Sequence, residues 1–124
     1  MEKYAGIIDE NGPRLPFCAK VRDKKSRISV PAEVRETYNL QPEDKIVLKY
    51  RRGWDDDAAN AVSLDGMLMT GNMDGSGRLT IHAEARDLFE KKSPGKKLYL
   101  IEILIEQIYR PIPPYQDPNH TESP

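Results

Sequence analysis

The chain has 124 residues with a formal net charge of −1, and its hydrophobic and charged shares are 38% and 31%. This length suits one compact domain or two very small ones, and the near-zero charge excludes steering toward nucleic acid by the molecule as a whole. The single cysteine, Cys18, excludes an intramolecular disulfide and fits a reducing compartment, while no apolar run has the form of a signal peptide or the length of a membrane span. We therefore expect a cytoplasmic protein without a membrane partner.

Composition and turn signals divide the chain into predicted segments. In chain order they are an N-terminal arm or hairpin (1–18), a first repeat (19–52), a connector (53–66), a second repeat (67–108) and a proline-rich tail (109–124). The Asn11-Gly12 pair supplies a turn signal in the first segment. The polar tail has little apolar surface to bury, so we expect it to be disordered or extended.

The first repeat reads as strand, turn, strand, short helix and strand. Its stretch "RISV" alternates, which is typical of a half-buried strand. Pro31 suits the first turn of the helix that follows, because its missing N–H would have no helical partner there. Asn39 favours a left-handed end to that helix, and "KIVLKY" then alternates again as a strand.

The connector and the second repeat carry similar signals. Within "VSLDGMLM" the Asp65-Gly66 pair predicts the turn of a hairpin. "RLTI" repeats the alternation of "RISV", and "SPGKK" ends the helix that follows. A long apolar strand begins at Leu98. Two interpretations of it stay open: burial between the two repeats, or a homo-oligomer interface through residues 98–108.

The phrase "RDKKSRISVPAEVRE" (22–36) returns 51 residues later as "MDGSGRLTIHAEARD" (73–87). The residues that recur unchanged at this offset are Asp23/Asp74, Arg27/Arg78, Ala32/Ala83, Glu33/Glu84 and Arg35/Arg86. The pattern indicates a duplicated supersecondary unit. Neither copy is large enough to enclose a core alone, so we expect the two to pack face to face about a pseudo-twofold axis.

The stretch "KVRDKKSRISVPAEVRETYNLQPEDKIVL" resembles the swapped-hairpin module of the AbrB/MazE/SpoVT family, and the tandem arrangement is similar to MraZ. The resemblance covers residues 19–50 and, less closely, residues 70–103. It implies a mainly β fold with short helices, in which two AbrB-like swapped-hairpin repeats form one pseudo-twofold, β-barrel-like domain. Ser26 stands where the module has glycine, and His82 replaces the proline that starts its helix. Because serine tolerates positive φ poorly, we expect the first turn to differ in shape.

Charge is unevenly distributed along the chain. Residues 19–52 carry ten basic and five acidic side chains, and residues 70–103 carry six and five. A nearly neutral chain can thus present one basic face, as phosphate neutralisation requires. The resemblance implies an AbrB-like transcriptional regulator that binds double-stranded DNA through such a face. The candidate contacts are the basic residues of the module's strand, turn and helix: Lys20, Arg22, Lys24, Lys25, Arg27, Arg35, Arg78 and Arg86.

The arginines of the two turns have two interpretations. The guanidinium groups of Arg27 and Arg78 can fork onto a phosphate or a guanine edge. Each can equally pair with the aspartate four residues earlier, Asp23 or Asp74, and lock its turn. Sequence alone leaves this choice open.

Two other functions remain as alternatives. One is an antitoxin-type DNA-binding protein whose C-terminal tail binds a toxin, and the other is a β-barrel protein-interaction module without DNA binding. An enzyme is disfavoured because no catalytic constellation can be assembled, and Cys18 lacks a nearby base. His82 and His120 are too isolated for a metal site, and His82 is expected to cap or pack near a helix start. We predict no cofactor.

Overall fold

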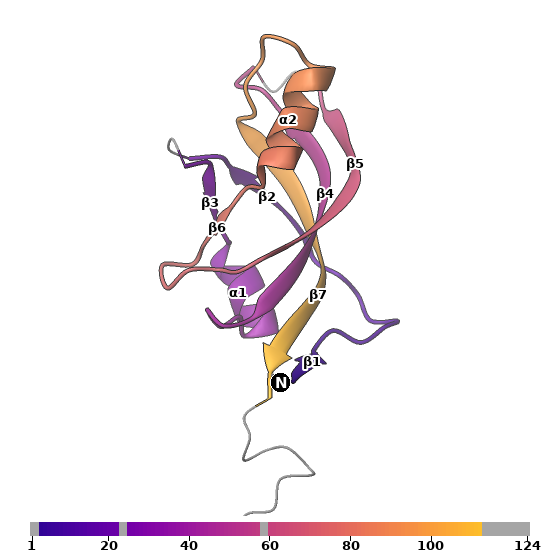
Figure 1. The fold of residues 1–124 in the computed structure, drawn as a ribbon, viewed down its shortest axis with the longest axis vertical. Coiled ribbons are helices and arrows are strands. Elements are labelled where there is room, and N and C mark those ends of the chain that lie inside the picture. The colour runs from indigo at the N-terminus through magenta and orange to yellow at the C-terminus, as the bar shows by residue number, and fades with distance from the viewer. Residues whose placement is uncertain (1–2, 23–24, 58–59, 113–124) are drawn as a thin grey trace, which may run out of the picture.

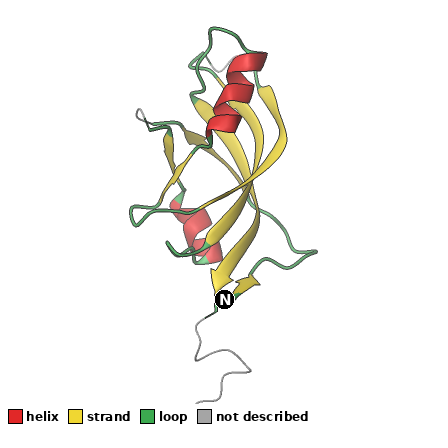
Figure 2. Cartoon of the chain, viewed as in Figure 1, coloured by secondary structure: helices red, strands yellow, loops and turns green. Residues whose placement is uncertain are grey.

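The computed structural model describes residues 3–22, 25–57 and 60–112. The elements of this part of the chain (Figure 1) are β1 (Tyr4–Gly6), β2 (Pro16–Lys20), β3 (Arg27–Ser29), α1 (Ala32–Tyr38), β4 (Lys45–Trp54), β5 (Val62–Gly71), β6 (Arg78–Thr80), α2 (Ala83–Lys92) and β7 (Leu100–Pro111). The strands form two antiparallel sheets, one ordered β1-β7-β4-β5 with β2 also paired to β7, and one made of β3 and β6. The mainly β class is confirmed (Figure 2), but the sheets do not close into the expected barrel.

The order strand, strand, helix, strand occurs twice, first in β2 to β4 and then in β5 to β7. Most strand pairing runs between these halves: β2 pairs with β7, β4 pairs with β5 and β7, and β3 pairs with β6. The small β3–β6 sheet lies to one side of the large sheet (Figure 1). Each half therefore supplies strands to a core that it is too small to enclose alone.

The last strand, β7, forms the centre of the large sheet. Its inward side chains are fully buried isoleucines: Ile101, Ile103, Ile105 and Ile108. One edge of β7 pairs with β4 and the other with β1 and β2. Both edges are thus used within the chain, which agrees with burial and leaves no edge of residues 98–108 for pairing with a second copy.

The two helices begin and end where local chemistry allows. α1 follows Pro31 and stops at Asn39, which takes the predicted left-handed conformation with φ 49°. The backbone N–H groups of Asn39 and Leu40 donate to carbonyls of the last turn. α2 buries Ala85 and Phe89 on one face. Neither helix is long and apolar enough to cross a membrane within the described residues.

The predicted hairpin at Asp65-Gly66 is wrong. Both residues do adopt positive φ, 60° and 66°, yet β5 continues through them as one strand. The β4–β5 register shifts beside this point, between Tyr50 and Arg52. The left-handed backbone therefore forms a bulge, which adds residues to one strand without reversing the chain. As a result, strands occupy most of the predicted connector 53–66.

The two ends of the described chain also differ from expectation. β1 and β2 do not pair with each other as an N-terminal hairpin, because both pair with β7. β7 runs past the predicted boundary at residue 108 to Pro111, and the Ile112 N–H donates to the Lys3 carbonyl. The first residues of the predicted tail thus belong to the sheet, while residues 113–124 lie outside the described residues.

A buried tyrosine joins β4 to the start of α2. The Tyr50 side chain is fully buried, and burial raises its pKa to about 12. Its hydroxyl lies 2.7 Å from Nδ1 of His82, whose Nε2 lies 2.9 Å from the Thr70 carbonyl oxygen. Nε2 therefore carries the hydrogen, and Nδ1 accepts from the tyrosine hydroxyl. His82 stands at the helix start, as expected, and packs there without a side-chain capping bond.

An ion pair joins the end of β7 to the start of β4. The Asp44 side chain is fully buried, and its two carboxylate oxygens accept hydrogen bonds of 2.9 and 2.7 Å from Arg110. The same guanidinium donates to the carbonyls of Tyr38 and Asn39 at the end of α1. The carboxylate raises the pKa of Arg110. This bidentate pair holds three elements in one arrangement.

We expect the Arg110→Met substitution to lower the free energy of unfolding by about 3 kcal/mol, because it leaves the buried Asp44 carboxylate without its cation. Chemical denaturation measures this loss. Arg51→Met is the matched control, since the Arg51 side chain is 45% exposed and lies 4.0 Å from Glu102. The control should lose less than about 1 kcal/mol. Equal losses in the two variants would contradict the role assigned to Arg110.

Candidate nucleic-acid interface

The β3–β6 ribbon presents one apolar and one polar face. Ile28 and Leu79 point into the core and are 1% and 2% exposed. The alternate positions point outward, and they are Arg27, Ser29, Arg78 and Thr80. Arg27 stands opposite Thr80, and Arg78 stands opposite Ser29, so the two arginines lie on a diagonal of the ribbon. A DNA major groove is about 12 Å wide and admits a two-stranded ribbon of this kind.

A shallow hollow beside the ribbon brings together three of the predicted contacts. It has a volume of about 210 Å³ and is lined by Arg22, Arg27, Ile28, Ser29 and Arg78. Arg22 reaches it because the backbone of Arg22 exchanges two hydrogen bonds with that of Arg27, of 2.8 and 3.1 Å. The described lining residues include three guanidinium groups and no carboxylate, so this part of the surface is positive.

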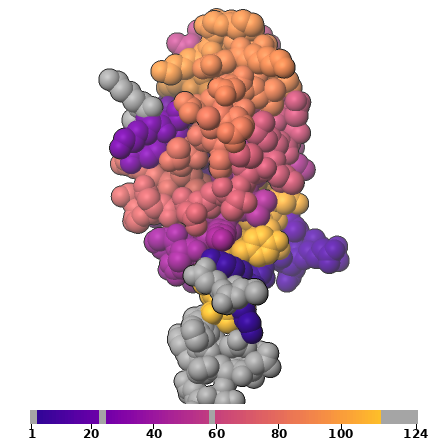
Figure 3. All heavy atoms as spheres, in the orientation of Figure 1, coloured from indigo at the N-terminus to yellow at the C-terminus, as the bar shows by residue number. Residues whose placement is uncertain are grey.

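Each turn that carries an arginine is anchored to the other half of the chain. The Ile81 N–H donates to the Ser26 carbonyl at 2.8 Å, and the Val30 N–H donates to the Gly77 carbonyl at 2.9 Å. Ser26 takes the left-handed conformation at φ 55°, as Gly77 does at φ 78°. These reciprocal bonds hold the first turn in a conformation that serine alone disfavours. Residues of this turn project from the body at the left of Figure 3, in purple.

In the second copy, the aspartate locks the turn through the backbone. Oδ1 of Asp74 accepts the N–H groups of Ser76 at 2.8 Å and Arg78 at 3.0 Å. These bonds, that of Arg78 foremost, lower the pKa of Asp74. The exposed guanidinium of Arg78 forms no ion pair with this carboxylate in the described structure, so the turn does not depend on it. The corresponding Asp23 lies outside the described residues.

The remaining predicted contacts do not join this patch as one group. Nε of Arg35 donates to the Val30 carbonyl at 3.1 Å, and its side chain lies over Gly77. Arg86 lines a separate, larger hollow, and Lys20 lies on β2 with its ammonium 5.8 Å from the Tyr99 ring.

Two further placements complete the predicted set. Lys25 is exposed at the first turn, and Lys24 lies outside the described residues. Sequence reasoning missed Ser29 and Thr80, although the alternation in "RISV" and "RLTI" places them on the face of the arginines.

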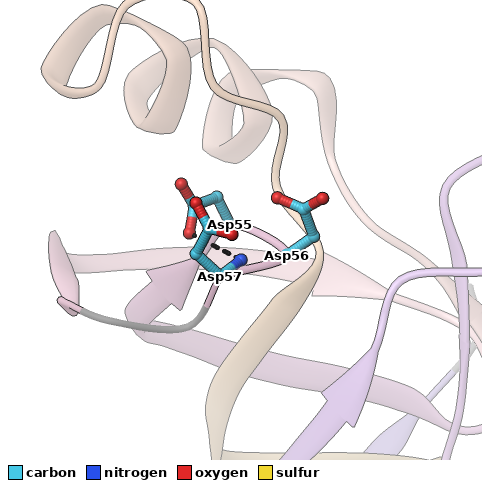
Figure 4. A group of neighbouring side chains, drawn as sticks. All are labelled: Asp55, Asp56 and Asp57. Atoms are coloured by element: carbon cyan, nitrogen blue, oxygen red, sulfur yellow. Dashed lines mark hydrogen bonds between the residues drawn. The ribbon is translucent and has the colours of Figure 1, made fainter.

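Three consecutive aspartates form an acidic cluster at the end of β4. The carboxylates of Asp55, Asp56 and Asp57 have ligand atoms within 4.8 Å of one another (Figure 4). Nζ of Lys96 lies 3.5 Å from Asp55 and 3.8 Å from Asp57, and the Asp57 N–H donates to Asp55 at 3.2 Å. A lysine thus already provides positive charge to this cluster.

No protein-family model matches the chain, and no curated protein matches it. Among solved structures, the chain is similar to the solution structure of PHS018 from Pyrococcus horikoshii. The two share 22% identity over 79% of this chain and 95% of that chain, with a TM-score of 0.58. At this identity the likeness concerns the fold alone.

We expect Asp74→Ala to lower the unfolding temperature at pH 7, because the turn loses the acceptor of two backbone N–H groups. The folded pKa of Asp74 is lowered. Its stabilisation is therefore complete above the unfolded carboxyl pKa of about 3.9 and is lost as the pH falls through the folded value.

The difference between wild type and variant should consequently narrow below about pH 4. Thermal unfolding over a pH series measures it, with Asp87→Ala, on the exposed face of α2, as the control. A difference of constant size down to about pH 3 would show that the charge of Asp74 does not support the turn.

Proposed function

We propose that the chain binds double-stranded DNA with the β3–β6 ribbon and acts as a transcriptional regulator of the AbrB-like type. The observation that carries the proposal is the hollow in which Arg22, Arg27 and Arg78 meet beside the outward face of the ribbon. Guanidinium groups bind phosphates and guanine edges with two parallel hydrogen bonds. A ribbon whose outer face bears arginine and hydroxyl side chains suits a major groove better than it suits a protein core.

The arrangement of the ribbon supports this proposal. Arg27 and Ser29 on one strand face Thr80 and Arg78 on the other, so the outward face has approximate twofold symmetry. A DNA duplex has twofold symmetry as well, and many regulators match it by forming dimers. A swapped-hairpin arrangement of two repeats in one chain would present the same symmetry without a second subunit. The pairing of β2 with β7 and β4 with β5 is what such an arrangement requires.

The predicted contacts take different roles in this proposal. Arg27 and Arg78 point outward from the ribbon, so they reach base edges or phosphates inside the groove. Arg22 and Lys25 flank the ribbon and neutralise phosphates at its rim. Arg35 supports the second turn instead, because its side chain packs over Gly77.

One observation favours the protein-interaction alternative. β5 is the outer strand of the large sheet, and its second edge pairs with no other described strand. Leu68 on this strand is 56% exposed. An uncovered edge beside an exposed leucine is the surface to which a partner strand can add. This function predicts binding that does not depend on Arg27 or Arg78.

We expect Arg27→Gln and Arg78→Gln each to weaken DNA binding about tenfold or more, because each substitution removes a charge-assisted contact. The double variant should lose most of its salt dependence, since that dependence reports the phosphates neutralised. Fluorescence anisotropy with mixed genomic duplexes, repeated at several salt concentrations, measures both effects.

Lys91→Gln is the matched control, because it removes one exposed positive charge on α2, away from the ribbon. It should bind DNA like wild type. If wild type shows no salt-sensitive binding at micromolar concentration, or if the double variant binds as tightly as the control, DNA recognition by the ribbon is refuted.

A further inference from the structure

A second hollow lies where the two halves of the chain meet. It has a volume of about 670 Å³, within the range of small-molecule pockets. α2 contributes Arg86 and Glu90 to its wall, the segment 95–99 contributes the opposite side, and the first half contributes Val21 and Ser26. None of these residues except Arg86 belongs to the predicted DNA-binding set.

Arg86 has an unsatisfied guanidinium in this hollow. Its Nε is buried and has no hydrogen-bond partner. Arg35 occupies the same position in the first repeat, 51 residues earlier, and there Nε donates to the Val30 carbonyl at 3.1 Å. A buried N–H without an acceptor costs free energy, so the state of Arg86 calls for a ligand that supplies one.

The difference between the two arginines follows from the turns they face. A Cβ added at Gly77 would lie 3.3 Å from Cδ and Nε of Arg35, so that arginine occupies the space above a residue without a side chain. The first repeat has Ser26 at the equivalent position, and Ser26 lines the hollow together with Arg86. The serine side chain takes up space that the glycine leaves open, and Arg86 does not form the bond that Arg35 forms.

The charges around Arg86 favour an anion. Lys97 also lines the hollow and, like Arg86, forms no ion pair in the described structure. Lys96 is paired with Asp55 and Asp57. Two carboxylates, Asp56 and Glu90, are on the wall as well, and Glu90 does not pair with Arg86 although it follows four residues later on α2.

The rest of the wall is suited to an apolar group. Leu98 is 5% exposed, Val21 is half-buried, and the Tyr99 ring is 40% exposed. Pockets for small organic molecules combine such apolar surface with a few charged groups that fix orientation. An inorganic ion alone would leave this surface uncovered.

We propose that this hollow is a binding site for a small organic anion, in which a carboxylate or phosphate group pairs with Arg86 and Lys97. The apolar body of the ligand lies against Leu98, Val21 and Tyr99. The site is separate from the outward face of the ribbon, and the proposal does not depend on DNA binding.

Titration of the ¹⁵N-labelled chain with phenyl phosphate, benzoate, benzyl alcohol and inorganic phosphate tests the proposal. NMR should show saturable shifts at residues 95–99 and at the Arg86 Nε–H for phenyl phosphate, benzoate or both, with dissociation constants of roughly millimolar order. The anion that binds tighter identifies the preferred group. Absence of saturable shifts with both aromatic anions would overturn the proposal, as would equal affinity for benzyl alcohol or for inorganic phosphate.

Matched variants make the test specific. Arg86→Gln and Lys97→Gln should each weaken binding of the aromatic anion about fivefold or more, while Lys91→Gln on the same helix should leave it unchanged. Lys97 is exposed, so its variant keeps the test valid if Arg86→Gln does not fold. Glu90→Gln should tighten binding by removing repulsion. Unchanged affinity in the Lys97→Gln variant would overturn the assignment.

Discussion

The structure depends on the pairing of β3 with β6 across the two halves of the chain. This short antiparallel ladder buries Ile28 and Leu79 and turns the outer face of the ribbon to solvent. Hydrogen bonds from Ile81 to Ser26 and from Val30 to Gly77 extend it at both ends. Because each turn is held by the opposite half, neither half can form its arginine-bearing turn in this way on its own.

Duplication has given the two turns different environments. In the second repeat, Gly77 leaves space that Arg35 fills, and the turn is closed by Asp74. In the first repeat, Ser26 stands in that space and Arg86 remains without a hydrogen-bond partner beside a hollow of about 670 Å³. The symmetric part of the fold thus supports the proposed DNA contact, while the asymmetric part creates the proposed ligand site.

The sequence predicted local elements better than long-range arrangement. The strands at Arg27 and Arg78 and the left-handed helix end at Asn39 depend on neighbouring residues, so pattern alone locates them. The positive φ at Asp65 was predicted as well, but whether it makes a turn or a bulge depends on its pairing with β4, which sequence does not reveal.

The candidate site shows the same limit. The alternation in "RISV" and "RLTI" brings Arg27 and Arg78 to one face, as the repeat predicted. It cannot show that Arg35 packs over Gly77 or that Arg86 lines another hollow, because those placements follow from how the halves interlock. The predicted basic face is therefore smaller than expected and is centred on the ribbon.

The most direct test of the account is an NMR map of the surface that duplex DNA touches. Titration of a short duplex into the ¹⁵N-labelled chain should perturb the backbone and arginine signals of β3, β6 and their two turns, and leave the edge of β5 unchanged. Perturbations that centre on Leu68 and β5, or that spread evenly over the surface, would contradict recognition by the ribbon.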